Sequence, residues 1–203
     1  MIAILDYDAG NLRSVEKAFL YLGQDVTVTA DPKTILSADR VVLPGVGAFR
    51  DAMDKLKAAG LDSVVKEVVA NKTPFLGICL GMQLMYEYSE EGNCEGLGIL
   101  GGSVKRFSQD SGLKIPQIGW NHLTVQKESR LLAGIELPPY VYFVHSYFVD
   151  AKDKSTVSAT VEYGDVADVL VETDSIHLTQ FHPEKSGKTG LKMLENFASG
   201  VSL

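Results

Sequence analysis

Cys79 lies in the pattern Gly77-Ile78-Cys79-Leu80-Gly81, where a run of apolar residues that predicts a strand meets a short helical segment. Glycines two residues on either side of a nucleophile allow the tight, strained turn that exposes it. At this turn the thiol would lie at the carboxyl edge of a sheet, where α/β folds bind ligands. The N-terminus of the following helix would favour a thiolate, and the Leu80 amide would donate a hydrogen bond to an oxyanion. A small core residue, as most free cysteines are, is the alternative for Cys79. Cys94 has no comparable context and lies among acidic residues that would oppose a thiolate, so we expect it to be inert.

His182 is the strongest candidate for a base among the four histidines. It follows a predicted strand, and Pro183 biases it toward an extended backbone. Because residues i and i+2 of an extended segment point the same way, Glu184 can lie beside the imidazole and fix its tautomer. Cys79, His182 and Glu184 are therefore a candidate catalytic triad. His145 competes as the base, but no acid lies at close spacing to it in the sequence.

A second feature is the loop Pro44-Gly45-Val46-Gly47, between a predicted strand and a predicted helix. Its two glycines leave backbone amides unobstructed, which suits a second donor to an oxyanion. An ordinary strand-to-helix turn is the alternative. A phosphate-binding loop is not indicated, because the segment lacks both a Gly-Lys-Ser/Thr ending and the spacing of a dinucleotide-binding loop.

Two hydrophobic periodicities alternate in the first half of the chain and predict the elements that position these residues. Short apolar runs predict strands at 2–5, 26–28, 40–43 and 74–78; helical spacing predicts helices at 11–22, 48–59, 61–69, 81–86 and 187–198. The second half predicts further strands at 103–107, 120–125, 141–149, 157–163, 169–172 and 176–181. We expect an α/β fold with a single open, mostly parallel, flavodoxin-like sheet, helices on both faces and added antiparallel strands.

The composition argues against several classes of protein. The 203 residues carry 19 Lys and Arg against 26 Asp and Glu, a net charge of −7, which argues against a nucleic-acid partner. Two cysteines cannot form a disulfide scaffold and point to a reducing compartment. No secretory signal and no apolar run of about 18 residues is present, so we expect a cytoplasmic protein away from membranes. The His and Cys spacing does not suit a metal, and no cofactor is expected.

Three segments together resemble the class I (triad) glutamine amidotransferases: residues 44–47, 77–83 and 181–186. Within that family, residues 6–15, 118–121 and 144–147 are most similar to the glutaminase subunits of imidazole glycerol phosphate synthase. The resemblance covers most of the chain and implies one glutamine amidotransferase domain over residues 1–203. Two positions depart from the usual pattern: Gln117-Ile118 replaces a frequent His-Met pair, and Gly101 replaces a frequent proline. Neither departure involves the triad.

The resemblance implies that Cys79 attacks the side-chain amide of glutamine, with the oxyanion held by the amides of Leu80 and of Val46 or Gly47. Glutamine contacts are implied for Gly47, Gln83, His145, Ser146 and Tyr147. It further implies a separate (β/α)8-barrel cyclase subunit that uses the ammonia in histidine biosynthesis, because 203 residues leave no room for an acceptor domain.

Asn11, Trp120 and Lys185 are the residues that the resemblance places toward this barrel. Core packing is the alternative for Trp120, and a solvated surface cation is the alternative for Lys185.

Three other functions compete with this interpretation. A glutaminase of the pyridoxal phosphate synthase type would share the triad, but it should lack the Gly-Asn-Leu entry and the Gly-Trp-Asn segment. An α/β cysteine hydrolase or peptidase would share the turn around the thiol, but Gln83 and residues 145–147 favour free glutamine as the substrate. A non-catalytic binding subunit would not need the intact combination of Cys79, His182 and Glu184.

Overall fold

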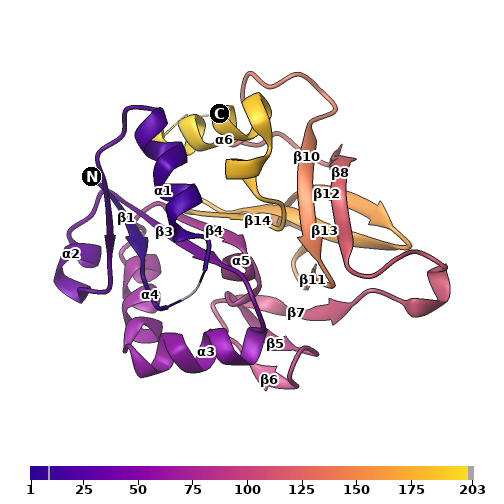
Figure 1. Cartoon of the computed structure of the whole chain (residues 1–203), viewed down its shortest axis with the longest axis horizontal. Coiled ribbons are helices and arrows are strands. Elements are labelled where there is room, and N and C mark those ends of the chain that lie inside the picture. The colour runs from indigo at the N-terminus through magenta and orange to yellow at the C-terminus, as the bar shows by residue number, and fades with distance from the viewer. Residues whose placement is uncertain (9, 201–203) are drawn as a thin grey trace.

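Five parallel strands form the half of the main sheet that carries the thiol (Figure 1). The structure is a computed structural model that describes residues 1–8 and 10–200. The parallel strands lie in the order β2 (Val26–Thr29), β1 (Ile2–Leu5), β3 (Arg40–Gly45), β4 (Phe75–Cys79) and β14 (Ile176–Thr179). This is the strand order of flavodoxin-like sheets, in which ligands bind beyond the carboxyl ends of the strands. The predicted fold class is confirmed.

Helices cover both faces of this parallel half. On one face lie α1 (Leu12–Tyr21) and α6 (Gly187–Ser199); on the other lie α2 (Pro32–Leu36), α3 (Phe49–Ala58) and α4 (Leu61–Ala70) (Figure 1). Alternate residues of β1 divide between the two faces: Ile4 belongs to the same core as Phe19 of α1, and Leu5 to the same core as Val65 of α4. All the residues of β1 are buried, which explains the continuous apolar run in the sequence.

Most of the remaining strands extend the sheet beyond β14, largely by antiparallel pairing. The extension runs through β13 (Asp165–Glu172), β11 (Tyr147–Ala151), β7 (Leu100–Arg106), β5 (Tyr86–Ser89) and β6 (Cys94–Glu95), with β5 parallel to β7. Two more strands, β12 (Val157–Tyr163) and β9 (Thr124–Val125), branch from β13. The second half of the chain thus supplies most of the added antiparallel strands, as predicted, whereas the antiparallel pair β5 and β6 comes from the first half and was not predicted.

A separate two-stranded sheet consists of β8 (Gln117–His122) and β10 (Tyr140–His145). The prediction of one strand over 141–149 was wrong, because the chain passes from β10 to β11 at Ser146 and so changes sheet. Residues 140–149 are apolar apart from His145 and Ser146, so the segment reads as one strand and hydrophobicity alone does not reveal the break. Residues 145–147 thereby form a bend between two sheets.

Several short elements differ from the sequence predictions. The helix expected over 81–86 is the single turn α5 (Leu80–Gln83), and Tyr86 already belongs to β5. Helix α2 was missed although its start carries a clear signal: the Asp31 carboxylate accepts a hydrogen bond from the Thr34 amide at 3.0 Å, and Pro32 occupies the first turn. Three 3-10 turns complete the chain: η1 (Gln109–Ser111), η2 (Lys154–Thr156) and η3 (Pro183–Lys185). Within residues 1–8 and 10–200, none of the helices has the length and apolar character needed to cross a membrane.

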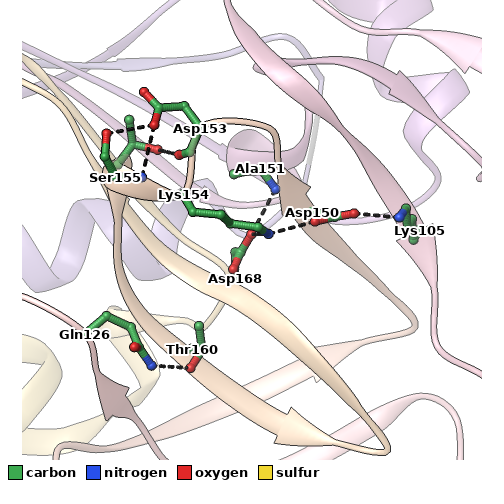
Figure 2. A network of polar contacts seen from close by, with 10 residues as sticks. Lys105, Gln126, Asp150, Ala151, Asp153, Lys154, Ser155, Thr160 and Asp168 are labelled. Atoms are coloured by element: carbon green, nitrogen blue, oxygen red, sulfur yellow. Dashed lines mark hydrogen bonds and ion pairs between the residues drawn. The ribbon is translucent and has the colours of Figure 1, made fainter.

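A polar network ties the antiparallel extension together beside η2 (Figure 2). Lys154 Nζ lies 2.7 Å from both Asp150 Oδ1 and Asp168 Oδ2, and the Ala151 amide donates to Asp168 Oδ2 at 2.8 Å. Asp168 is buried, whereas Lys105, which pairs with Asp150 at 2.5 Å, is exposed. Because a buried carboxylate needs a partner, Lys154 is the residue on which this end of the sheet depends.

Lys154→Met should therefore lower the free energy of unfolding by about 1–3 kcal/mol, because Asp168 stays buried without its cation. Chemical denaturation at neutral pH measures the loss. The matched control is Lys192→Met, which removes the exposed pair between Lys192 and Glu195 and should cost less than about 0.5 kcal/mol. Equal losses in the two variants would contradict a special role for the buried carboxylate.

Candidate active site

Cys79 adopts a strained backbone conformation at the end of β4, with φ 55° and ψ −109°. A non-glycine residue rarely adopts a positive φ, and one that does so at a strand-to-helix turn is typical of a nucleophile. The two flanking glycines are required sterically. A Cβ at Gly81 would overlap the carbonyl oxygen of Leu43, and one at Gly77 would lie 2.7 Å from Cδ2 of Leu178. The turn predicted from the sequence is therefore present, and it is packed directly against β3.

The three residues of the predicted triad lie together. His182 Nδ1 lies 2.8 Å from Glu184 Oε1, and both side chains are fully buried. His182 Nε2 is buried and has no hydrogen-bond partner within residues 1–8 and 10–200, and Cys79 is close enough to act electrostatically on the ring. Burial by itself would lower the pKa of His182, but the Cys79 sulfur and the Glu184 carboxylate outweigh it and raise the pKa to about 9. At neutral pH the site therefore favours an imidazolium beside the sulfur.

Asn11 holds the acid of the triad, a contact that the sequence did not predict. Its Nδ2 donates to Glu184 Oε1 at 2.6 Å, so one carboxylate oxygen accepts from both Asn11 and His182. Asn11 itself has a left-handed backbone, with φ 74°, at the start of α1. The residue expected only at a partner surface thus also orients the triad.

The loop 44–47 lies beside the thiol because β3 and β4 are in register, with Gly45 opposite Cys79. Tyr7, which sequence reasoning missed, fixes the base of this loop: its hydroxyl donates to the Pro44 carbonyl at 2.8 Å. Burial raises the pKa of Tyr7, and the charge of Cys79 adds to this effect, so the phenol stays protonated as a donor. Gly47, at φ 105°, requires glycine. The loop is therefore anchored at Pro44, and its last residue has a conformation that other residues rarely adopt.

A cleft of about 410 Å³ opens over the thiol. It is lined by Cys79 and His182 and by all of the residues predicted to contact the substrate: Gly47, Gln83, His145, Ser146 and Tyr147. Val46 and Leu80, the predicted oxyanion residues, line it too. Glu91 also reaches the cleft, although no motif identified it.

His145 does not compete as the base. Burial lowers its pKa to about 4, so the ring is neutral, and both ring nitrogens already have partners. Nδ1 lies 2.8 Å from the Tyr147 carbonyl oxygen, and Nε2 lies 3.0 Å from the side-chain amide of Gln117. His145 therefore stiffens the wall of the cleft, and His182 remains the candidate for proton transfer.

Two of the three predicted partner residues are exposed. Trp120 is 46% exposed and stacks on Tyr140, with ring centroids 5.5 Å apart, so core packing is not its role. Lys185 is exposed at the rim of the cleft. Ile118 and Tyr140, 62% and 46% exposed, extend the apolar surface around Trp120.

Comparison with known proteins agrees with this geometry. The family model described as glutamine amidotransferase class-I matches residues 3–201, and the chain belongs to that family. Solved structures share the fold: PurLQS from Thermotoga maritima (TM-score 0.75, 18% identity, 99% of this chain and 98% of that chain) and the glutaminase domain of Trypanosoma brucei CTPS with bound acivicin (TM-score 0.64, 20% identity, 100% and 95%).

More similar relatives carry a more specific name. A protein of Campylobacter jejuni (strain 81-176) named imidazole glycerol phosphate synthase subunit HisH 1 is 50% identical over 200 residues, covering 98% of this chain and 99% of the relative. Imidazole glycerol phosphate synthase subunit HisH of Caldanaerobacter subterraneus is 49% identical over 202 residues, with 99% and 98% coverage. A HisH 1 subunit of Methanococcus maripaludis is 48% identical over 201 residues, with 97% and 98% coverage.

Gly81→Ala should destabilise the fold by at least about 3 kcal/mol, because the new methyl group overlaps the backbone of β3. Gly101→Ala is the matched control: at this exposed position of β7 a Cβ would meet the side chains of Lys152 and Glu87 at ordinary contact distances of 3.5 Å and 4.0 Å. Thermal unfolding of both variants measures the difference. A Gly81→Ala variant as stable as Gly101→Ala would contradict the close packing of the turn.

The pH dependence of glutamine hydrolysis tests the charge state of His182. Because its pKa is raised to about 9, the protonated ring that donates to the leaving nitrogen persists through neutral pH, and kcat/KM should fall only as the pH approaches 9. Glu184→Gln removes the carboxylate that helps to raise the pKa of His182. The fall in kcat/KM should therefore move to lower pH, toward the ordinary histidine pKa of about 6.5. Glu195→Gln, on the exposed side of α6, serves as the control. An unchanged profile in Glu184→Gln would show that the carboxylate does not set this pKa.

Proposed function

We propose that this chain is the glutaminase subunit of an imidazole glycerol phosphate synthase. It hydrolyses glutamine to glutamate and ammonia, and a cyclase subunit uses the ammonia to make imidazole glycerol phosphate and AICAR in histidine biosynthesis. The observation that carries this proposal is the buried thiol, imidazole and carboxylate at the base of the cleft, in a chain that shares about half of its residues with relatives of that name over nearly its whole length.

In the proposed reaction the Cys79 thiolate attacks the side-chain amide carbon of glutamine. The electron pair of the carbonyl moves to oxygen, and this oxyanion accepts hydrogen bonds from the amide of Leu80 and from that of Val46 or Gly47. His182 passes its Nε2 proton to the nitrogen, the carbon–nitrogen bond breaks, and ammonia leaves behind a glutamyl thioester. Glu184 keeps the ring oriented throughout.

Water completes the cycle. The neutral His182 accepts a proton from a water molecule as its oxygen attacks the thioester carbon. The carbon–sulfur bond then breaks, glutamate is released, and the thiolate beside the imidazolium is restored. One amide bond and one water molecule are consumed, and one ammonia and one glutamate are formed.

The cleft offers groups that suit the ends of glutamine. Gly47, Gln83, Ser146 and Tyr147 all line the cleft together with Cys79, and we assign them to contacts with glutamine. Glu91, whose pKa burial raises, already accepts a hydrogen bond from the Phe49 amide at one oxygen and presents a carboxylate to the cleft. We assign it to the ammonium group of glutamine, because a carboxylate is the natural partner of a cation.

Ammonia released into bulk water would be protonated and lost, so the product must pass directly to an acceptor site. We propose a heterodimer in which a (β/α)8-barrel cyclase covers the mouth of the cleft. The surface around Trp120 and Tyr140, with Asn11 and Lys185 nearby at the triad, is the side we assign to that partner. The whole chain, residues 1–203, would act as one glutaminase domain, in the cytoplasm, where its two free thiols persist.

Cys79→Ala tests the proposal in the complex with the cyclase subunit. The variant should abolish synthesis with glutamine as the nitrogen source and leave synthesis with added ammonium intact, because only the thiol step is lost. Cys94→Ala, a change to a thiol outside the cleft, should leave both activities unchanged. The same assay should give weak glutamine hydrolysis by the isolated chain and strong hydrolysis with the cyclase and its nucleotide ligand. Glutamine-dependent synthesis by Cys79→Ala would contradict the assignment of the nucleophile.

A further inference from the structure

We propose that Gln180 is a further catalytic residue, whose side-chain amide donates a hydrogen bond to the Cys79 sulfur and stabilises the thiolate. Gln180 Nε2 lies 3.6 Å from Cys79 Sγ, within hydrogen-bond range for sulfur, and the residue is completely buried. The inference deepens the proposed function and rests on it for one point, that Cys79 is the nucleophile. Neither the thiol pattern nor the histidine motif had identified Gln180.

The orientation of this amide follows from a backbone group. Gln83 Nε2 lies 3.0 Å from the Tyr147 carbonyl oxygen and 2.9 Å from Gln180 Oε1. A backbone carbonyl only accepts hydrogen bonds, so the atom of Gln83 that faces it is the nitrogen. That nitrogen has a second hydrogen, which needs the oxygen of Gln180 as its acceptor. The nitrogen of Gln180 is therefore the atom that faces the sulfur.

The Tyr147 carbonyl that starts this chain is itself held in place. It also accepts from Nδ1 of His145, at 2.8 Å, and the neutral state of that ring leaves the proton on the nitrogen that needs it. Gln83 is 4% exposed and His145 is 6% exposed, so water does not readily compete for these bonds. Gln83 and His145 are positioning residues for Gln180.

The thiolate needs such a donor for two reasons. Cys79 is only 7% exposed, and α5 is a single turn, so solvent and helix together stabilise the charge weakly. The titratable groups beside the sulfur are His182 and Tyr7. His182 gives up its proton to the leaving ammonia, whereas the amide of Gln180 cannot.

Gln180 thus remains a donor to sulfur throughout the cycle, including the step in which the thiolate leaves the thioester carbon. Position supports this role. Gln180 and His182 both follow β14, two residues apart, and both side chains act on Cys79: Gln180 through its amide at 3.6 Å and His182 through its ring.

Two variants of similar size test the inference. Gln180→Met removes the donor, and Gln180→Glu replaces it with an acceptor that carries a like charge. The pH midpoint for alkylation of Cys79 by iodoacetamide, followed by peptide mass spectrometry, should rise in the order wild type, Met, Glu. For Gln180→Met we expect a shift of about one pH unit and a kcat for glutamine hydrolysis about tenfold lower, with KM within about twofold, the size of one charge-assisted hydrogen bond.

The matched control is Gln126→Met, which removes a surface amide that donates to Thr160 at 3.0 Å (Figure 2). Gln126 is not among the residues that line the cleft. It should change neither the alkylation midpoint nor kcat. If Gln180 had a purely structural role, both substitutions would lower the stability of the fold. The pH midpoints for alkylation of Cys79 would then not rise in the order wild type, Met, Glu. Unchanged midpoints in both Gln180 variants would overturn the inference.

If the Gln180 variants fail to fold, the wild-type chain decides. With glutamine side chains labelled with ¹⁵N, one buried amide signal should shift on alkylation of Cys79, and the same treatment of Cys79→Ala should move none. No responding amide in the wild type would overturn the inference. Alkylation needs neither glutamine nor the cyclase, so its result is separate from the proposed function, which falls only if Cys79→Ala keeps glutamine-dependent synthesis.

Discussion

The backbone of Cys79 is the constraint on which the site depends. A non-glycine residue at φ 55° is unfavourable by itself, and it persists because the surrounding strands over-determine it. Gly81 packs against the Leu43 carbonyl, and the register of β3 with β4 sets Gly45 opposite the thiol. The sheet therefore fixes the nucleophile, and the loop and the histidine are brought to it from neighbouring strands.

The groups around the Cys79 sulfur are each held in place by hydrogen bonds to other residues. His182 is held by Glu184, which is held by Asn11; the loop at Pro44 is held by Tyr7; and the amide of Gln180 is held through Gln83. Tyr7 and Asn11 lie four residues apart in the segment after β1. A partner that shifts this short segment would thus act on the base of the oxyanion loop and on the acid of the triad together, which suits a site whose activity is to be coupled to a second subunit.

The sequence predicted the parallel half of the fold and the triad because both leave local signals: buried strands give continuous apolar runs, and the turn around Cys79 requires glycines at 77 and 81. It did not predict the change of sheet at Ser146, because the apolar residues on both sides of His145 and Ser146 read as one strand and the choice of sheet depends on partners distant in the sequence. Tyr7 and Gln180 were missed for a related reason. Tyr7 contacts Pro44, 37 positions away, and Gln180 contacts Cys79, 101 positions away. Contacts between residues so far apart follow no regular spacing that the sequence would reveal. The position of Gln180 two residues before His182 is a local signal that the sequence predictions did not use.

In the proposed reaction one of the two cysteines, Cys79, carries the glutamyl group. The most direct measurement is peptide mass spectrometry after incubation with an electrophilic analogue of glutamine, in competition with glutamine itself. We expect one analogue to bind covalently per chain, at Cys79 and not at Cys94. Glutamine should slow this labelling, and the fraction of glutamine hydrolysis lost should equal the fraction of Cys79 labelled. Loss of hydrolysis with the label on Cys94, or with no label on either thiol, would contradict the assignment of Cys79 as the nucleophile.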